Sequence, residues 1–205
     1  MAIEIIALNA IGLPPTRVQE WLELLQRHPL FAATELTALQ LPLFVLVIPV
    51  IAAICLATWE RDAVVAGLAF VFAIVGITIF LATDPVLPLL ALSRDYAAAA
   101  SDADRASVIA AARAVMALAT TSVDVGTAIL AFAWIGTASL MRDSAPFAKP
   151  TAVLAALAGA TELVAVGVDL FLGTANILLL ELAGALMVLW LVSAGRDLRR
   201  LGATL

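Results

Sequence analysis

Residues 151–171 read TAVLAALAGATELVAVGVDLF, a run that is apolar apart from a few hydroxyls and two carboxylates, Glu162 and Asp169. A helix of about 20 mainly apolar residues crosses the hydrocarbon core of a bilayer, so this run predicts a transmembrane helix. No Lys or Arg lies between Lys149 and Arg196, so no basic residue nearby in sequence could pair with the two acids. The stretch therefore indicates the fold class and raises the question of what its carboxylates do.

The composition of the whole chain agrees with a membrane protein. Of the 205 residues, 64% are hydrophobic and 13% are charged, and the mean hydropathy is +1.11. Soluble domains average about 45–50% apolar and about 25% charged residues. Because the apolar residues also come in long blocks, we predict an all-α, integral membrane helical bundle.

Four further apolar runs bring the predicted number of transmembrane helices to about five. They are residues 30–59, whose strongest part is 41–59, then 63–83, 115–140 and 177–194. Residues 115–140 belong to a longer predicted helix of roughly 40 residues, which begins at the capping box formed by Ser101 and Asp104 and ends near Met141. Residues 86–93 are too short to span, so we expect an interfacial or re-entrant segment there.

An amphipathic helix is predicted before the first span. Residues 16–19 have the form of a capping box, and Val18, Trp21, Leu22 and Leu25 recur at helical spacing. We expect this helix to lie on the membrane surface, and docking to a partner is the alternative. The predicted organisation is an amphipathic surface segment (1–29), one transmembrane domain (30–195) and a basic C-terminal tail (196–205), with the tail placed in the cytoplasm.

A stretch at residues 80–119 resembles a family of small multi-pass bacterial membrane proteins that is known only as a domain of unknown function. The motifs that carry the resemblance are Ala82-Thr83-Asp84-Pro85 and the LSRDYAAA stretch at 92–99, followed by an acidic helix start. Residues 21–31 and 194–202 are similar to the ends of that family. Ala112-Arg113-Ala114 departs from its pattern. The resemblance implies a helical integral membrane protein and brings no catalytic residues.

Acidic residues within the predicted spans form the candidate polar site. An intramembrane ionisable residue is a functional-site hypothesis by default. The candidate residues are Asp124, Glu162, Asp169 and Glu181, together with Arg113 and Thr121. Three interpretations stay open. The acids are protonated and hydrogen-bond locally, or they line a polar cavity for a proton, a cation or a polar substrate, or they pair with Arg113 or with an arginine of a partner subunit.

Small residues and tryptophans give expectations about packing. Ala155 and Gly159, and likewise Ser122 and Gly126, have the small-xxx-small spacing that allows helices to approach closely. We expect them to serve packing within the bundle, with homodimerisation as the alternative. Trp59, Trp134 and Trp190 are expected near the membrane interfaces, where tryptophan is enriched.

Several classes of function are excluded by what the sequence lacks. Cys55 is the single cysteine and His28 the single histidine, so neither a metal box nor a histidine-dependent triad can form inside the membrane. The pI of about 4.7 argues against nucleic acid as a partner. We therefore expect no cofactor, no metal and no enzymatic activity.

The expected function is a non-enzymatic accessory, assembly, or lipid- or partner-binding role in the bacterial cytoplasmic (plasma) membrane. Membrane lipids, a protein partner or a second copy in a homo-oligomer are the expected partners. The alternative is a small proton- or cation-linked carrier or sensor that uses Asp124, Glu162, Asp169 and Glu181.

Overall fold

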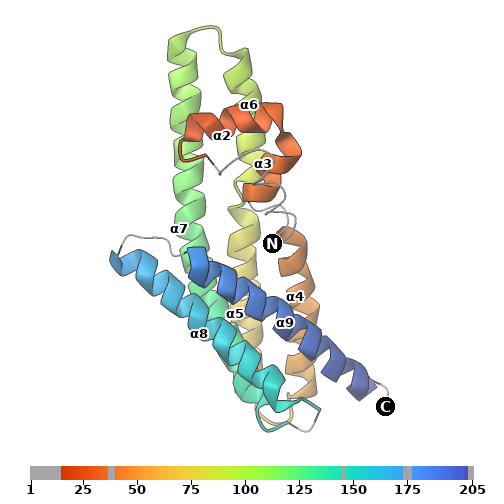
Figure 1. Ribbon diagram of the computed structural model, residues 1–205. Helices are drawn as coiled ribbons and strands as arrows, with labels where there is room; N and C mark the ends of the chain where they lie inside the picture. The colour runs from red at the N-terminus through yellow and green to blue at the C-terminus, as the bar shows by residue number, and fades with distance from the viewer. Residues whose placement is uncertain (1–14, 37–39, 145, 173–176, 203–205) are drawn as a thin grey trace. The chain divides into compact units, whose positions relative to one another are not determined.

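The computed structural model describes residues 15–36, 40–144, 146–172 and 177–202, which form helices joined by short connections. In chain order they are α2 (Val18–Arg27), α3 (Pro29–Leu36), α4 (Gln40–Ala57), α5 (Ala63–Ala82), α6 (Val86–Ala98), α7 (Asp102–Met141), α8 (Lys149–Leu172) and α9 (Ile177–Gly202) (Figure 1). The predicted all-α class is confirmed. Gly173 and Asn176 predict a tight turn between the last two apolar runs, and this turn lies outside the described residues.

Four helical stretches are long and apolar enough to cross a membrane, and α4 adds a shorter apolar helix. The four are Ala63–Ala98, Asp102–Met141, Lys149–Leu172 and Leu178–Gly202. The exposed surface of these helices is rich in large aliphatic and aromatic side chains, which suits contact with lipid tails. The chain is therefore a multi-pass helical membrane protein.

Local capping explains where the longest helix begins. The Ser101 hydroxyl accepts a hydrogen bond from the Asp104 N–H at 3.1 Å, and the Asp104 carboxylate accepts from the Ser101 N–H at 3.2 Å. This reciprocal pair is the predicted capping box, with Asp in the position usually held by Glu. From it α7 runs for 40 residues to Met141, as expected.

Two local expectations need correction, and a third stays a prediction. The helix α2 starts one residue later than predicted, with Arg17 as the N-cap, and the Glu20 carboxylate accepts a hydrogen bond from the Arg17 N–H at 3.4 Å. Residues 86–93 are the greater part of α6, which reaches Ala98, and their interfacial or re-entrant position stays a prediction. The basic tail is not separate from the last helix, because α9 continues through Gly195 to Gly202.

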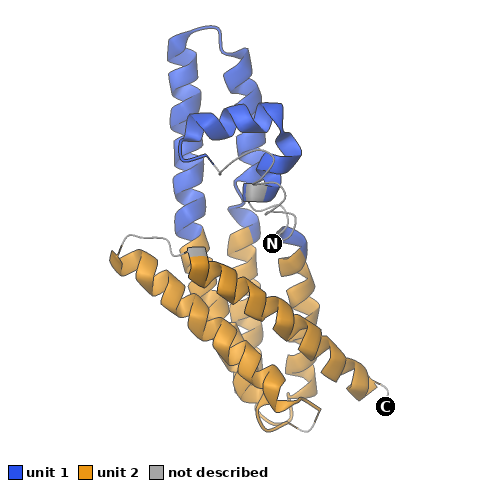
Figure 2. Ribbon diagram, in the orientation of Figure 1, with its two compact units in different colours: residues 1–42, 81–122 blue, residues 43–80, 123–205 orange. Residues whose placement is uncertain are grey.

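The residues divide by packing into two compact units (Figure 2). Unit 1 comprises residues 1–42 and 81–122, and unit 2 comprises residues 43–80 and 123–205. The predicted division into residues 1–29, 30–195 and 196–205 separates segments by their expected position relative to the membrane. It stays a prediction.

Unit 1 has a small apolar core around α2. Trp21, Leu22 and Leu25 are buried against Leu89 of α6 and Ala112 of α7, and α2 lies across α6 (Figure 1). The side chain of Gln26 adds a polar contact, since its Nε2 donates to the Ser93 carbonyl oxygen at 2.7 Å. The apolar face that we expected to lie on the membrane is therefore covered by helices of the same chain.

Unit 2 is a bundle whose helices approach closely at glycines. A Cβ atom on Gly76 of α5 would lie 3.0 Å from the carbonyl oxygen of Gly126 of α7. A Cβ atom on Gly159 of α8 would lie 2.8 Å from the carbonyl oxygen of Ala131 of α7. Both of the small-xxx-small motifs thus place a glycine in a contact within the bundle. Helices α8 and α9 also lie side by side (Figure 1).

Polar contacts tie together the connections at one end of unit 2. Arg61 contacts the carboxylate of Asp143 at 3.2 Å and the hydroxyl of Ser144 at 3.3 Å, which joins the α4–α5 connection to the α7–α8 connection. The buried Asp197 of α9 accepts hydrogen bonds from the Ala148 N–H at 3.0 Å and from the Thr151 hydroxyl at 2.6 Å. The C-terminal end of α9 therefore lies beside the start of α8.

Candidate functional site

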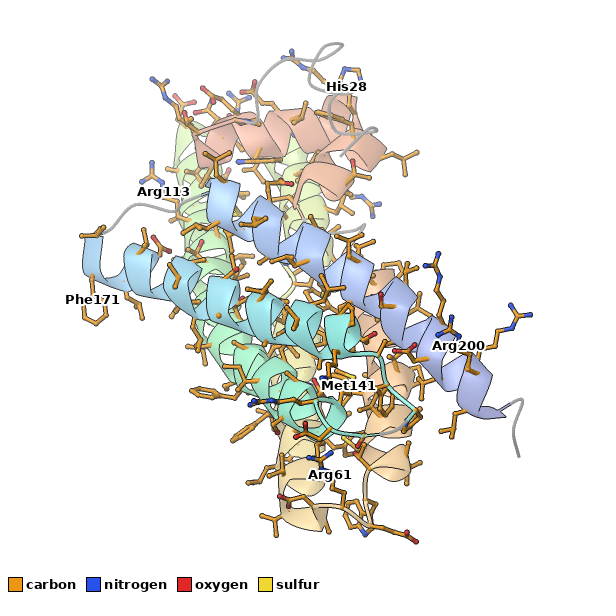
Figure 3. All side chains as sticks on the ribbon, turned by 60° about the horizontal axis from the view of Figure 1, so that its bottom comes forward. His28, Arg61, Arg113, Met141, Phe171 and Arg200 are labelled. Atoms are coloured by element: carbon orange, nitrogen blue, oxygen red, sulfur yellow. The ribbon has the colours of Figure 1, made fainter. Side chains whose placement is uncertain are left out.

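The six predicted site residues are distributed over both units. Asp124 of α7, Glu162 and Asp169 of α8 and Glu181 of α9 belong to unit 2, whereas Arg113 and Thr121 belong to unit 1. Arg113 is exposed, and its side chain is directed outward from α7 (Figure 3). The Thr121 hydroxyl donates a hydrogen bond to the Ala117 carbonyl oxygen of its own helix at 3.1 Å.

Helices α7 and α8 run antiparallel, and this arrangement pairs their polar residues. Gly159 packs against Trp134, and further along α8 the charges of Asp169 and Asp124 interact. Later residues of α8 thus meet earlier residues of α7. Asp124 and Asp169 are both half-buried, and they are the two carboxylates of the predicted set that the fold brings near each other.

Glu162 lies deeper in the interface between the helices. It is 8% exposed, and it sits about 20 Å along α8 from Lys149, near the middle of the helix. Its carboxyl group faces the indole N–H of Trp134 and interacts with it, but the pair does not meet the geometry of a hydrogen bond. Glu162 is thus the most buried of the four predicted acids and lies against an aromatic donor.

The predicted acids do not gather into one cluster. Glu181 is exposed on α9, close to the start of that helix. Within the described residues no group of three or more His, Cys, Asp or Glu side chains could hold a metal ion. The arrangement therefore separates into a half-buried pair, a buried single carboxyl group and an exposed one.

Two tryptophans that were not among the candidate site residues lie beside Glu162 or against each other. Trp134 and Trp190 are both fully buried in the core of unit 2, and their expected position near the membrane interfaces stays a prediction. Their rings meet edge to face with centroids 4.7 Å apart, an arrangement that aromatic pairs favour. Trp59 is the one of the three that is half exposed.

Asp197 was also missed as a structural residue. The sequence places it between Arg196 and Arg199 in an apparent tail, where it looks like a solvated charge. In the structure it is 4% exposed and accepts hydrogen bonds at the first turn of α8. A carboxylate at a helix N-terminus also interacts favourably with the helix dipole.

The class of the protein rests on its fold and composition, because the comparisons with known proteins found no match. No protein-family model, curated protein or solved structure matches the chain. The resemblance to a bacterial membrane family of unknown function stays a prediction. The fold and composition define a multi-pass helical membrane protein with Asp124, Glu162 and Asp169 at the α7–α8 interface.

Proposed function

We propose that the protein is a non-enzymatic accessory or assembly component of the bacterial plasma membrane, and that it binds a protein partner through unit 1. The observation that supports this proposal is the packing of α2. Its apolar residues Trp21, Leu22 and Leu25 are buried against α6 and α7, so they are not available to insert into lipid. What α2 leaves exposed is a charged face that includes Glu20 and Arg27.

Unit 1 also has exposed charged residues at the connection between α6 and α7 and on α6. Residues 101–107 are exposed without interruption, and they include Asp102, Asp104 and Arg105. Arg94 and Asp95 of α6 are exposed as well. A preformed surface with both signs of charge suits recognition of a polar partner surface, because charge complementarity gives specificity and speeds encounter.

Site-specific photo-crosslinking in cells tests this proposal. A photoreactive amino acid replaces Arg27 or Arg105, which are exposed, and Leu22, which is buried, provides the matched control. We expect one defined crosslinked species from the two exposed positions, and we expect it to be absent at position 22. Charge reversal at Arg27 and Arg105 together should reduce its yield. A chain that gives no specific species at either exposed position contradicts the proposal.

A carrier or sensor is the second candidate function, and the approach of Asp124 to Asp169 across α7 and α8 favours it. Two carboxylates whose charges interact can share a proton or a cation. Proteoliposomes that contain a pH-sensitive dye test this function. A carrier predicts proton flux that is lost in Asp169→Asn and retained in Glu181→Gln, whose carboxylate lies apart on the exposed face of α9. Liposomes with wild-type protein that are no leakier than empty ones exclude a proton carrier.

A further inference from the structure

Three buried polar side-chain atoms of unit 2 have no hydrogen-bond partner among the described residues. They are Nε1 of Trp134, Nε1 of Trp190 and Oε2 of Glu162. Both tryptophans are fully buried, and Glu162 is more than nine-tenths buried. A buried donor or acceptor is normally paired, so each of these atoms calls for a partner.

The three residues that carry these atoms form one contiguous cluster. The Trp134 ring contacts the Trp190 ring, and the Trp134 indole N–H faces the carboxyl group of Glu162. One residue comes from each of α7, α8 and α9, so the cluster lies where these helices meet. We refer to Trp134, Glu162 and Trp190 as the indole–carboxyl cluster.

The helix contacts fix the position of this cluster. Gly159 precedes Glu162 by about one helical turn, and a Cβ atom there would lie 3.0 Å from Cβ of Trp134. The close approach of α8 to α7 thus holds Glu162 beside Trp134. The edge-to-face contact with Trp190 adds α9 to the same point. These side chains are therefore held by packing and have little freedom to turn toward other partners.

The chemistry of the cluster selects its ligand. Two indole N–H groups are donors only, and the unpaired carboxyl oxygen is an acceptor. A cation would meet two positive N–H dipoles, and an anion would meet the carboxyl group. A water molecule accepts two hydrogen bonds and can donate one to the third atom. Buried waters typically make about three such bonds to otherwise unpaired protein groups.

We infer that the indole–carboxyl cluster binds an internal water molecule, which accepts hydrogen bonds from Trp134 and Trp190 and donates one to Glu162. This site lies in unit 2 and is independent of the partner surface proposed for unit 1. It gives the deepest of the four predicted acids a polar contact inside an apolar bundle. Glu162 is then a hydrated group and not a bare carboxyl group in the membrane.

Solid-state NMR of the full chain in lipid bilayers tests this inference. Tryptophan labelled with ¹⁵N gives indole signals from Trp21, Trp59, Trp134 and Trp190, which Trp→Phe variants assign. At short mixing times we expect water protons to transfer magnetisation to the indoles of Trp134 and Trp190. The indole of the half-exposed Trp59 is the positive control for transfer from water. The backbone amides of Trp134 and Trp190, which are hydrogen-bonded within their helices, are the negative control.

Variants of Glu162 test whether its carboxyl oxygen holds this water. Glu162→Gln keeps an acceptor oxygen, so we expect transfer to both indoles to persist. Glu162→Leu removes it, so we expect transfer to Trp134 and Trp190 to be lost while Trp59 is unchanged. Glu181→Leu is the matched control and should leave all four indoles as in the wild type. If Glu162→Leu does not fold, the wild-type and Glu162→Gln spectra decide. A dry indole at either Trp134 or Trp190 in the folded wild type overturns the inference.

Discussion

Single carboxylates in this protein have roles that depend on what their oxygens contact. Asp197 and Asp143 lie at the same end of unit 2, and each takes part in an ion pair, with Arg200 and Arg61 respectively. Asp143 remains 67% exposed in its side chain, whereas that of Asp197 is 5% exposed and also accepts two hydrogen bonds at the start of α8. We therefore expect burial and hydrogen bonding, and not the ion pair alone, to determine how much each carboxylate contributes to stability.

Replacing Asp197 by Ala should destabilise the protein more than replacing Asp143 by Ala. The first change leaves the Ala148 N–H and the Thr151 hydroxyl without their acceptor, which costs about 1–3 kcal/mol. The second removes an exposed pair worth about 0–1 kcal/mol. Reversible denaturation in mixed micelles measures both free energies of unfolding. Equal losses would show that Asp197 acts only as a surface charge.

Gly159 and Gly167 of α8 give a second matched comparison. At Gly159 a Cβ atom would lie 2.8 Å from a backbone oxygen, and at Gly167 nothing lies within 4 Å. Gly159→Ala should cost about 1–3 kcal/mol through overpacking. Gly167→Ala should be neutral or stabilising by roughly 0.5–1 kcal/mol, because alanine favours a helix more than glycine does. The same denaturation assay distinguishes them, and a tolerated alanine at 159 would refute the tight α7–α8 contact.

At the scale of elements, α2 shows that an amphipathic pattern states which face is buried and leaves open what buries it. Its apolar residues Trp21, Leu22 and Leu25 satisfy the same periodicity whether they meet lipid or protein. In the structure they meet α6 and α7. The covering surface comes from residues 89–112, which are distant in sequence, so local periodicity could not identify it.

Cysteine accessibility tests the docking of α2. The native Cys55 is buried, and a Cys55→Ala background leaves one introduced thiol for each variant. Leu25→Cys should react slowly with both water-soluble and lipid-soluble maleimides, because its side chain is covered by protein. Arg27→Cys, on the exposed face, should react fast with the water-soluble reagent. Rapid reaction of the thiol at position 25 with the lipid-soluble reagent alone would place this face in the membrane.

Helix signals in the sequence predicted much of the fold and less of the site. The capping box at Ser101 and the apolar runs of α5 and α8 depend on residues close in sequence, so their bounds follow from local chemistry. The burial of Trp134 and Trp190 and the position of Asp197 depend on contacts with other helices. Glu162 and Asp169 are seven residues apart, a spacing that places them on one face of a helix, but only the packing of α7 gives each its own neighbour.

At the scale of the whole molecule, the basic residues of unit 2 are not spread evenly over its ends. The polar contacts of Arg61 with Asp143 and of Asp197 with Ala148 bring the α4–α5 connection, the α7–α8 connection and the end of α9 to the same end. This end, called the basic end, holds all Lys and Arg residues of unit 2, namely Arg61, Arg142, Lys149, Arg196, Arg199 and Arg200. Within this unit the separation of basic residues is therefore complete.

The basic end of unit 2 should therefore face the cytoplasm, because short cytoplasmic connections carry the Lys and Arg excess. Single thiols in the Cys55→Ala background test the orientation. Asp143→Cys should react with a membrane-impermeant maleimide in inverted vesicles and stay unlabelled in intact spheroplasts, and a cysteine added after Leu205 should behave in the same way. Detergent should expose both thiols in either preparation, which controls for burial. Labelling in spheroplasts would reverse the orientation, and opposite results at the two positions would contradict the shared end that the Asp197 contacts establish.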